Sequence, residues 1–229
     1  MSVDLEKILR PVDNAAPAFE PKYMTLASGD DLVIRQVGQD EIPDILPYID
    51  PLRNVERDFY DIVAARLYAE LLGYYKNRVQ DEYVLVAQIN GELAAVVNGW
   101  RLSPEVGVSY HTMALRRGLR VGAHAFAAKM EYHMDTLKQE TVLIVAESPI
   151  GFRRWMIEYG LQKRDGQHEL GGATSYKLTR QLYFNSKSRL VAGERPVPED
   201  LLNFAHENLL VADEETIQEK ICGTIGGQR

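Results

Sequence analysis

The chain has 229 residues, of which 45% are hydrophobic and 26% are charged. This composition is typical of a globular protein, and it excludes a disordered chain, a collagen and a disulfide scaffold. The 33 acidic and 26 basic residues leave a formal net charge of -7, which argues against a nucleic-acid-binding protein, because such proteins usually carry a basic face.

The N-terminal part of the chain predicts an arm, a strand, two helices and a hairpin. Residues 1–24 are rich in proline, which favours an irregular arm over a regular element. A strand is predicted over residues 32–37 and a short helix over 40–46. In residues 57–76, apolar side chains recur every three or four positions, as in an amphipathic helix. The Asn90-Gly91 pair predicts a hairpin between a strand at 83–88 and another at 92–100.

The second part alternates strands and helices. Strands are predicted at 109–115, 141–146 and 175–182, and helices at 122–137 and 151–161. Beyond residue 185 the composition changes, and two short acidic helices are predicted at 198–210 and 213–222. The order indicates an α/β fold with a mixed, mostly antiparallel sheet flanked by helices over residues 25–185, followed by a helical C-terminal extension at 186–229.

A basic, glycine-containing turn follows the strand at 109–115 and opens the next helix. It contains Arg117, Gly118, Arg120 and Gly122. Unpaired backbone N–H groups and the helix dipole together make such a turn a cradle for an anion such as a pyrophosphate. The alternative is a strand-to-helix turn that needs glycine only for its shape, and the motif alone does not separate the two.

The element order and this turn resemble the GNAT (GCN5-related N-acetyltransferase) superfamily over about 160 residues. That family carries Q/R-x-x-G-x-G/A between a strand and a helix, and residues 117–122 occupy this slot. The resemblance implies a GNAT-like fold and an enzyme that transfers an acyl group from acetyl-CoA, or another acyl-CoA, to a primary amine. The residues that it assigns to binding this co-substrate are Thr112, Met113, Leu115, Arg117, Gly118, Leu119, Arg120, Val121, Gly122 and Ala123.

The chain departs from the family pattern at several positions. Arg120 replaces the usual first glycine, Pro149 the usual asparagine and Phe152 the usual alanine. Met156 stands where many members have the tyrosine that protonates the departing thiolate. Trp155 and Tyr159 flank this position, but helical geometry directs them elsewhere.

Three residues are candidates for proton transfer. By the resemblance, the backbone N–H of Thr112 or Met113 polarises the thioester carbonyl, and a base takes the proton of the amine. His111 is the first candidate, unless it packs on the opposite face of the sheet. Glu147 is the second, unless it only begins the helix that Ser148 caps. Tyr110 is a candidate acid or a core tyrosine.

The other expectations concern metals, acceptor, location and partners. The histidines lack metal-ligand spacing, His124 and His133 are expected on helix surfaces, and no metal is predicted. The lone Cys222, the acidic N-terminus and the absence of a long apolar run predict a cytoplasmic protein with neither membrane nor nucleic-acid partner. By the resemblance, residues 50–58 and 167–174 surround the amine acceptor and a homodimer is possible. The alternatives are a donor with a longer acyl chain, on acyl-CoA or acyl carrier protein, and a non-catalytic CoA-binding or protein-interaction domain.

Overall fold

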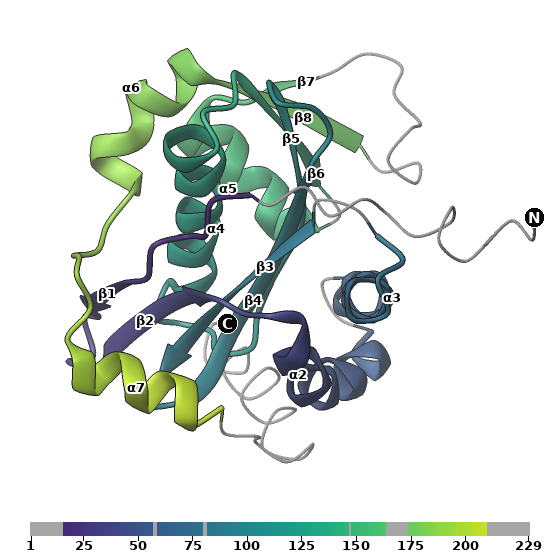
Figure 1. The fold of residues 1–229 in the computed structure, drawn as a ribbon. Coiled ribbons are helices and arrows are strands. Elements are labelled where there is room, and N and C mark those ends of the chain that lie inside the picture. The colour runs from purple at the N-terminus through teal and green to yellow at the C-terminus, as the bar shows by residue number, and fades with distance from the viewer. Residues whose placement is uncertain (1–15, 57–58, 80–81, 147, 164–173, 210–229) are drawn as a thin grey trace, which may run out of the picture.

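The structure is a computed structural model that describes residues 16–56, 59–79, 82–146, 148–163 and 174–209. One sheet of eight strands crosses the molecule in the order β1-β2-β3-β4-β5-β6-β8-β7 (Figure 1). Its strands are β1 (Lys22–Thr25), β2 (Asp31–Gln36), β3 (Glu82–Ile89), β4 (Glu92–Arg101), β5 (Val106–Ala114), β6 (Thr141–Ala146), β7 (Gln162–Lys163) and β8 (Thr174–Thr179). All neighbouring strands are antiparallel except β5 and β6, which are parallel. The predicted mixed, mostly antiparallel sheet flanked by helices is therefore confirmed.

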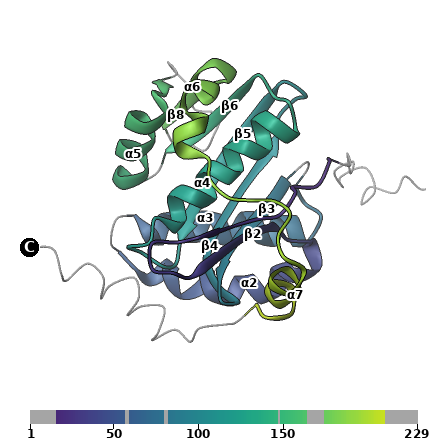
Figure 2. The same cartoon turned by 90° about the vertical axis from the view of Figure 1, so that its left-hand side faces the viewer.

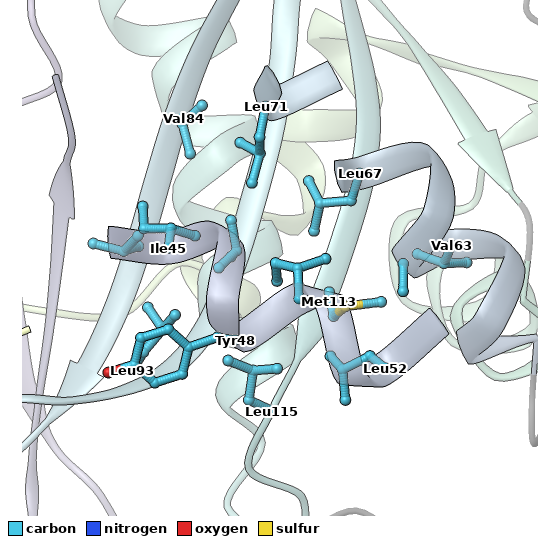
Figure 3. Close-up of a cluster of buried hydrophobic side chains, with 14 of the residues drawn as sticks. Ile45, Tyr48, Leu52, Val63, Leu67, Leu71, Val84, Leu93, Met113 and Leu115 are labelled. Carbon is cyan, nitrogen blue, oxygen red and sulfur yellow. The ribbon is translucent and has the colours of Figure 1, made fainter. Parts of the chain in front are cut away.

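Helices cover both faces of this sheet. The first face carries α2 (Ile42–Ile49) and α3 (Tyr60–Tyr75), with short 3-10 turns at Gln39–Glu41 and Asp50–Asn54. Side chains of both helices pack on β3, β4 and β5 in one apolar cluster (Figure 3). The second face carries α4 (Val121–Glu131), α5 (Pro149–Tyr159) and α6 (Arg180–Leu190). In Figure 2, α5 and α6 lie at one end of the sheet and α7 (Glu199–Glu207) lies at the other, against β2.

The parallel pair β5–β6 opens part of the way along its length. Residues Val106 to Ser109 pair with Thr141 to Ile144. Beyond that point β5 continues to Ala114 and β6 to Ala146 without pairing to each other. The two central strands therefore splay apart, and backbone groups on their facing edges are not used by the ladder.

Several boundaries differ from the sequence prediction. Strand β1 begins inside the segment predicted as an irregular arm, because a four-residue edge strand directly after Pro21 is too short to show a recognisable alternation. The last strand ends at Thr179, and helix α6 follows where the strand was predicted to continue to residue 182. Thr179 caps this helix by accepting from the Leu182 N–H. The predicted boundary at residue 185 thus falls within α6, and the division into three parts stays a prediction. The helix predicted at 213–222 lies outside the described residues.

His133 is buried, so the prediction that it lies on a helix surface is wrong. It occupies a π-helical turn, Tyr132–Thr136, that continues α4. Its Nδ1–H donates to Gln139 Oε1 at 2.6 Å, and its Nε2 accepts from the Tyr83 hydroxyl at 2.6 Å. Burial lowers the pKa of His133 to about 3, so the imidazole is neutral at physiological pH.

Gly107 on β5 lies directly against this buried histidine. A Cβ at this position would overlap Gln139 Oε1 and His133 Nδ1. We expect Gly107→Ala to lower the free energy of unfolding by about 1–3 kcal/mol, because overpacking displaces a hydrogen-bonded pair that cannot relax into solvent. Chemical denaturation measures the change. Gly73→Ala is the matched control, since this helical residue's Cβ would meet only one methyl group of Val79, at 3.1 Å. Equal losses in both variants would contradict the prediction.

Candidate functional site

Strand β5 carries a bulge next to the point where β5 and β6 part. Val97 pairs with Thr112, whereas Gly99 pairs with Ser109, so two β5 residues, Tyr110 and His111, lie opposite Asn98 alone. Such a bulge bends the strand and leaves backbone groups without ladder partners. The His111 N–H instead donates to Asn98 Oδ1 at 3.0 Å. The bulge is therefore supported by a side chain of the neighbouring strand.

A lysine supports the bulge from the face of the sheet that carries α4. Lys129 extends from α4 and is fully buried. Its ammonium donates to the His111 carbonyl at 2.8 Å and to the Asn98 carbonyl at 3.2 Å. These carbonyls belong to the residues on the two sides of the bulge, so the lysine holds both strands in this shape.

A pocket of about 350 Å³ opens beside the bulge, where the strands splay. It is bounded by the end of β5, the turn after it and the N-terminal ends of α3, α4 and α5. Its lining residues are Tyr60, Val63, Thr112, Met113, Ala114, Arg116, Arg117, Gly118, Arg120, Val121, Gly122, Ala123, Ser148, Gly151 and Trp155. The hydroxyl of Thr112 is buried and has no hydrogen-bond partner in the part of the chain that the structure describes. A buried polar atom of this kind costs free energy unless a ligand or water satisfies it.

The turn between β5 and α4 is basic and its backbone is left-handed at two positions. Gly118 has φ 90° and Arg120 has φ 60°. No side chain caps the N-terminus of α4 in the described residues. The first N–H groups of the helix and the positive end of its dipole therefore face the pocket side, together with Arg116, Arg117 and Arg120. This arrangement favours an anion.

Two of these arginines have partners within the protein. Arg117 Nε donates to the Tyr60 hydroxyl at 2.9 Å, and its guanidinium lies 4.6 Å from the centre of the Tyr60 ring. The same hydroxyl donates to the Ala114 carbonyl at 3.1 Å, which connects α3 to the end of β5. Arg120 is 61% exposed and lies 4.0 Å from Glu158 on α5, an ion pair that solvent screens. Arg120 can therefore turn toward a ligand at little cost.

The structure brings most of the predicted co-substrate residues together. Thr112, Met113, Arg117, Gly118, Arg120, Val121, Gly122 and Ala123 all line the pocket. Leu115 does not, because it packs in the cluster under α2 and α3 that Figure 3 shows. Leu119 packs against the cluster on the opposite face. For these two residues only the backbone remains for binding.

Two of the three predicted proton-transfer residues lie at the bulge, and the third is not among the described residues. Tyr110 and His111 lie side by side at the bulge with ring centroids 5.8 Å apart. The His111 side chain is buried, and burial raises the pKa of Tyr110 to about 12. Glu147 lies outside the described residues. The cap expected next to it is present, since Ser148 accepts from the Gly151 N–H at 3.1 Å.

The acceptor-side residues predicted from the sequence are partly described. Asp50 forms an ion pair with Arg53 on the surface, and Glu56 is exposed. Asp58 and residues 167–173 lie outside the described residues. Met156, where the family pattern has tyrosine, packs in the cluster of α4, α5 and β8. Trp155 was expected to point elsewhere but lines the pocket, where it stacks on Phe126 at 4.1 Å.

Glu82 is a polar residue of this region that the sequence did not reveal. It begins β3, and its Oε1 accepts from Asn98 Nδ2 at 3.0 Å. Burial, with a smaller contribution from the charge of Glu70, raises the pKa of Glu82 to about 8, although the Asn98 hydrogen bond opposes the rise. Only the partnership with Asn98 distinguishes it from an ordinary strand-end acid, and pairing across strands cannot be read from spacing.

Metal-binding clusters and membrane-spanning helices are both absent from the described residues. Within them, no group of three or more His, Cys, Asp and Glu side chains is placed to hold a metal ion. None of the helices in that same part of the chain is both long and apolar enough to span a membrane.

Comparisons with known proteins give structural matches only. No family model matches the sequence, and no curated protein matches it. An uncharacterized protein (bh2621) from Bacillus halodurans has a TM-score of 0.55 at 11% identity, covering 75% of this chain and 96% of that protein. Mycobacterium smegmatis RimJ in complex with CoA-disulfide has a TM-score of 0.52 at 9% identity, covering 73% and 91%. The GNAT domain of S. lividans PAT has a TM-score of 0.51 at 12% identity, covering 72% and 99%. At identities this low, the structural matches show a common fold alone.

Proposed function

Starting from the GNAT fold that this chain has, we propose that it is an N-acyltransferase that moves an acetyl group from acetyl-CoA to a primary amine. The observation that carries the proposal is the pocket at the splay of β5 and β6, lined by the uncapped N-terminus of α4 and by three arginines. A diphosphate fits that end, because helix N–H groups and guanidinium groups both bind phosphate oxygens. The unpartnered Thr112 hydroxyl supports a polar ligand further along the pocket.

The reaction would proceed by direct attack in a ternary complex. The amine nitrogen forms a bond to the thioester carbonyl carbon, the C–S bond breaks, and the thiolate leaves and takes a proton from solvent. A backbone N–H of β5 near Thr112 or Met113 would stabilise the charge that develops on the carbonyl oxygen. The bulge held by Asn98 and Lys129 keeps that part of β5 in a fixed shape. Tyr110, His111 and Glu147 remain candidates for moving the protons.

The alternative of a longer acyl donor depended on a run of small residues in α4. Of these, Ala125, Ala127 and Ala128 are buried in the core, and Ala123 lines the pocket. The run therefore packs the helix on the sheet and gives no specific support to a longer chain. The cytoplasmic location remains a proposal that rests on the lone Cys222 and the lack of a long apolar run, and the homodimer remains one that rests on the family resemblance.

Mixing the pure protein with acetyl-CoA and a panel of primary amines, while following the free thiol, tests the proposed function. We expect amine-dependent release of CoA and acetylated amine by mass spectrometry. CoA binding without turnover on any amine would instead favour the non-catalytic CoA-binding domain. No CoA binding at millimolar concentration would refute both and leave the protein-interaction domain.

A charge reversal tests the position of the anion. We expect Arg120→Glu to raise the dissociation constant of CoA about tenfold, because it replaces an attraction for phosphate with a repulsion in a solvent-exposed place. Calorimetric titration measures it, and the effect should shrink at high salt. Lys76→Glu is the matched control, since Lys76 is an exposed residue at the far end of α3. An equal effect in both variants would argue for a general field and against a site at α4.

A further inference from the structure

A carboxylate, two aromatic rings and an amide gather on the α3 side of the sheet next to the bulge. Glu82 on β3 pairs across the strands with Trp100 on β4. The Trp100 ring is stacked on Tyr110 of β5, with centroids 6.2 Å apart and planes 6° apart. The charges of Glu82 and of Glu70 on α3 both act on the Tyr110 hydroxyl, so these groups lie within electrostatic reach of one another.

Asn98 links this carboxylate to the bulge. Its Nδ2 donates to Glu82 Oε1 at 3.0 Å, and its Oδ1 accepts from the His111 N–H at 3.0 Å. The Glu82 carboxylate is therefore two hydrogen bonds away from the backbone that precedes Thr112, the pocket residue of β5. One amide fixes both the carboxylate and the strand whose N–H groups would hold the thioester.

We propose that Glu82 is the general base of this site, taking the proton from the acceptor amine directly or through one water. This inference rests on the proposed acyltransferase function. As the amine nitrogen bonds to the carbonyl carbon, its proton passes to the Glu82 carboxylate. The C–S bond then breaks, the CoA thiolate takes a proton from solvent, and the protonated Glu82 returns its proton to solvent, so that atoms and charge balance.

Glu82 suits this role better than His111. The His111 side chain is 3% exposed, and both its backbone N–H and its carbonyl are engaged in holding the bulge. Glu82 has one carboxylate oxygen hydrogen-bonded to Asn98. Burial brings its pKa to about 8, and a general base is most effective when its pKa lies near the working pH. The groups that interact with it are Glu70 from α3, Asn98 from β4 and Tyr110 from β5.

The first experiment replaces the carboxylate by its amide. We expect Glu82→Gln to lower kcat/KM for the amine by about 100-fold or more, while the dissociation constant of CoA stays within twofold. The folded state of the wild-type protein loses stability as pH rises from about 4.5 to about 8, because the unfolded chain ionises Glu82 near 4.5 whereas the folded protein must ionise it in a buried place. The variant should therefore be at least as thermally stable as the wild-type protein at pH 8.5, so that its lower activity cannot be ascribed to unfolding. Glu105→Gln, on an exposed turn, is the matched control.

The second experiment moves the titration of the base without removing it. The wild-type kcat/KM should rise with pH to a plateau with a midpoint near 8. In Glu70→Gln this midpoint should move to lower pH with the plateau rate kept within threefold, since a negative charge that raises the pKa of Glu82 is gone. His111→Gln should leave the midpoint where it is.

The outcomes separate this inference from the proposed function. If the wild-type protein acetylates an amine and Glu82→Gln does so within threefold of its rate, Glu82 is not the base and the acyltransferase stands. If His111→Gln removes the pH dependence and Glu82→Gln does not, His111 is the base. If the wild-type protein acetylates no amine, the proposed function and the role of Glu82 fall together.

Discussion

Replacing Lys129 with alanine is expected to lower the free energy of unfolding by about 3–5 kcal/mol, the largest loss among the variants considered. The substitution removes a fully buried side chain from beneath the sheet and leaves a cavity. It also withdraws the donor from the His111 and Asn98 carbonyls, whose burial then goes uncompensated. Urea denaturation with a two-state fit measures the loss.

Two further variants show which part of this loss is due to hydrogen bonding. Lys129→Met keeps most of the volume, so its loss relative to the wild-type protein reports on the two carbonyls and on the buried charge. Lys76→Ala removes an exposed lysine and should change stability by less than about 0.5 kcal/mol. A loss below 1 kcal/mol in Lys129→Ala would mean that the bulge does not depend on the ammonium group.

The second large effect is a loss of folding stability at acidic pH. The unfolded chain protonates His133 near its ordinary pKa of 6.5, whereas the folded protein does so only near pH 3. The contribution of His133 to stability is therefore fully present above pH 6.5 and is lost as pH falls from there toward 3. Between pH 7 and pH 4.5 we expect a loss of about 2–3 kcal/mol from this group alone.

A difference measurement isolates this contribution. His133→Gln does not titrate, yet it can still hydrogen-bond to Tyr83 or Gln139. We expect the wild-type protein to be the more stable of the two at pH 7 and its advantage to shrink by about 2–3 kcal/mol at pH 4.5. Taking the difference cancels the opposite trend of Glu82, which both proteins share. An advantage that stays constant across this range would contradict a neutral buried imidazole.

The architecture could be predicted from local patterns because its central elements are long. The strands around Asn90-Gly91 pair as a hairpin. The apolar side chains that recur along the helix from Tyr60 onward pack in the cluster of Figure 3. Helix α6 was missed because its residues are mostly polar and carry little periodicity, and its start depends on the Thr179 cap. The edge strand β1 was missed because it is defined by its partner β2.

The candidate site was predictable only where backbone chemistry dominates. The turn at Gly118 and the start of α4 follow from glycine and basic residues in sequence, and they line the pocket. The bulge, in contrast, depends on a register shift between β4 and β5, and alternation along β5 alone does not reveal it. Glu82, Asn98 and Lys129 come from three different elements, and only the fold brings them to one place. His133 followed a helical pattern that indicated a surface, but the π-helical turn directs it inward.

The segment after α6 has a consequence for biosynthesis. Glu194 exchanges two backbone hydrogen bonds with Tyr23 next to the start of β1, and the Ala205 carbonyl accepts from Arg35 of β2, 170 residues earlier in the chain. Gln88 of β3 also donates to the Ala205 carbonyl. While the ribosome is still making the chain, the first strands therefore wait without these partners, exposing the edge of the sheet to other chains. Folding at this edge has to finish after most of the protein has been synthesised. Translation speed and chaperones should therefore affect the fraction of chains that pair this edge correctly more than the fraction that form the central hairpin.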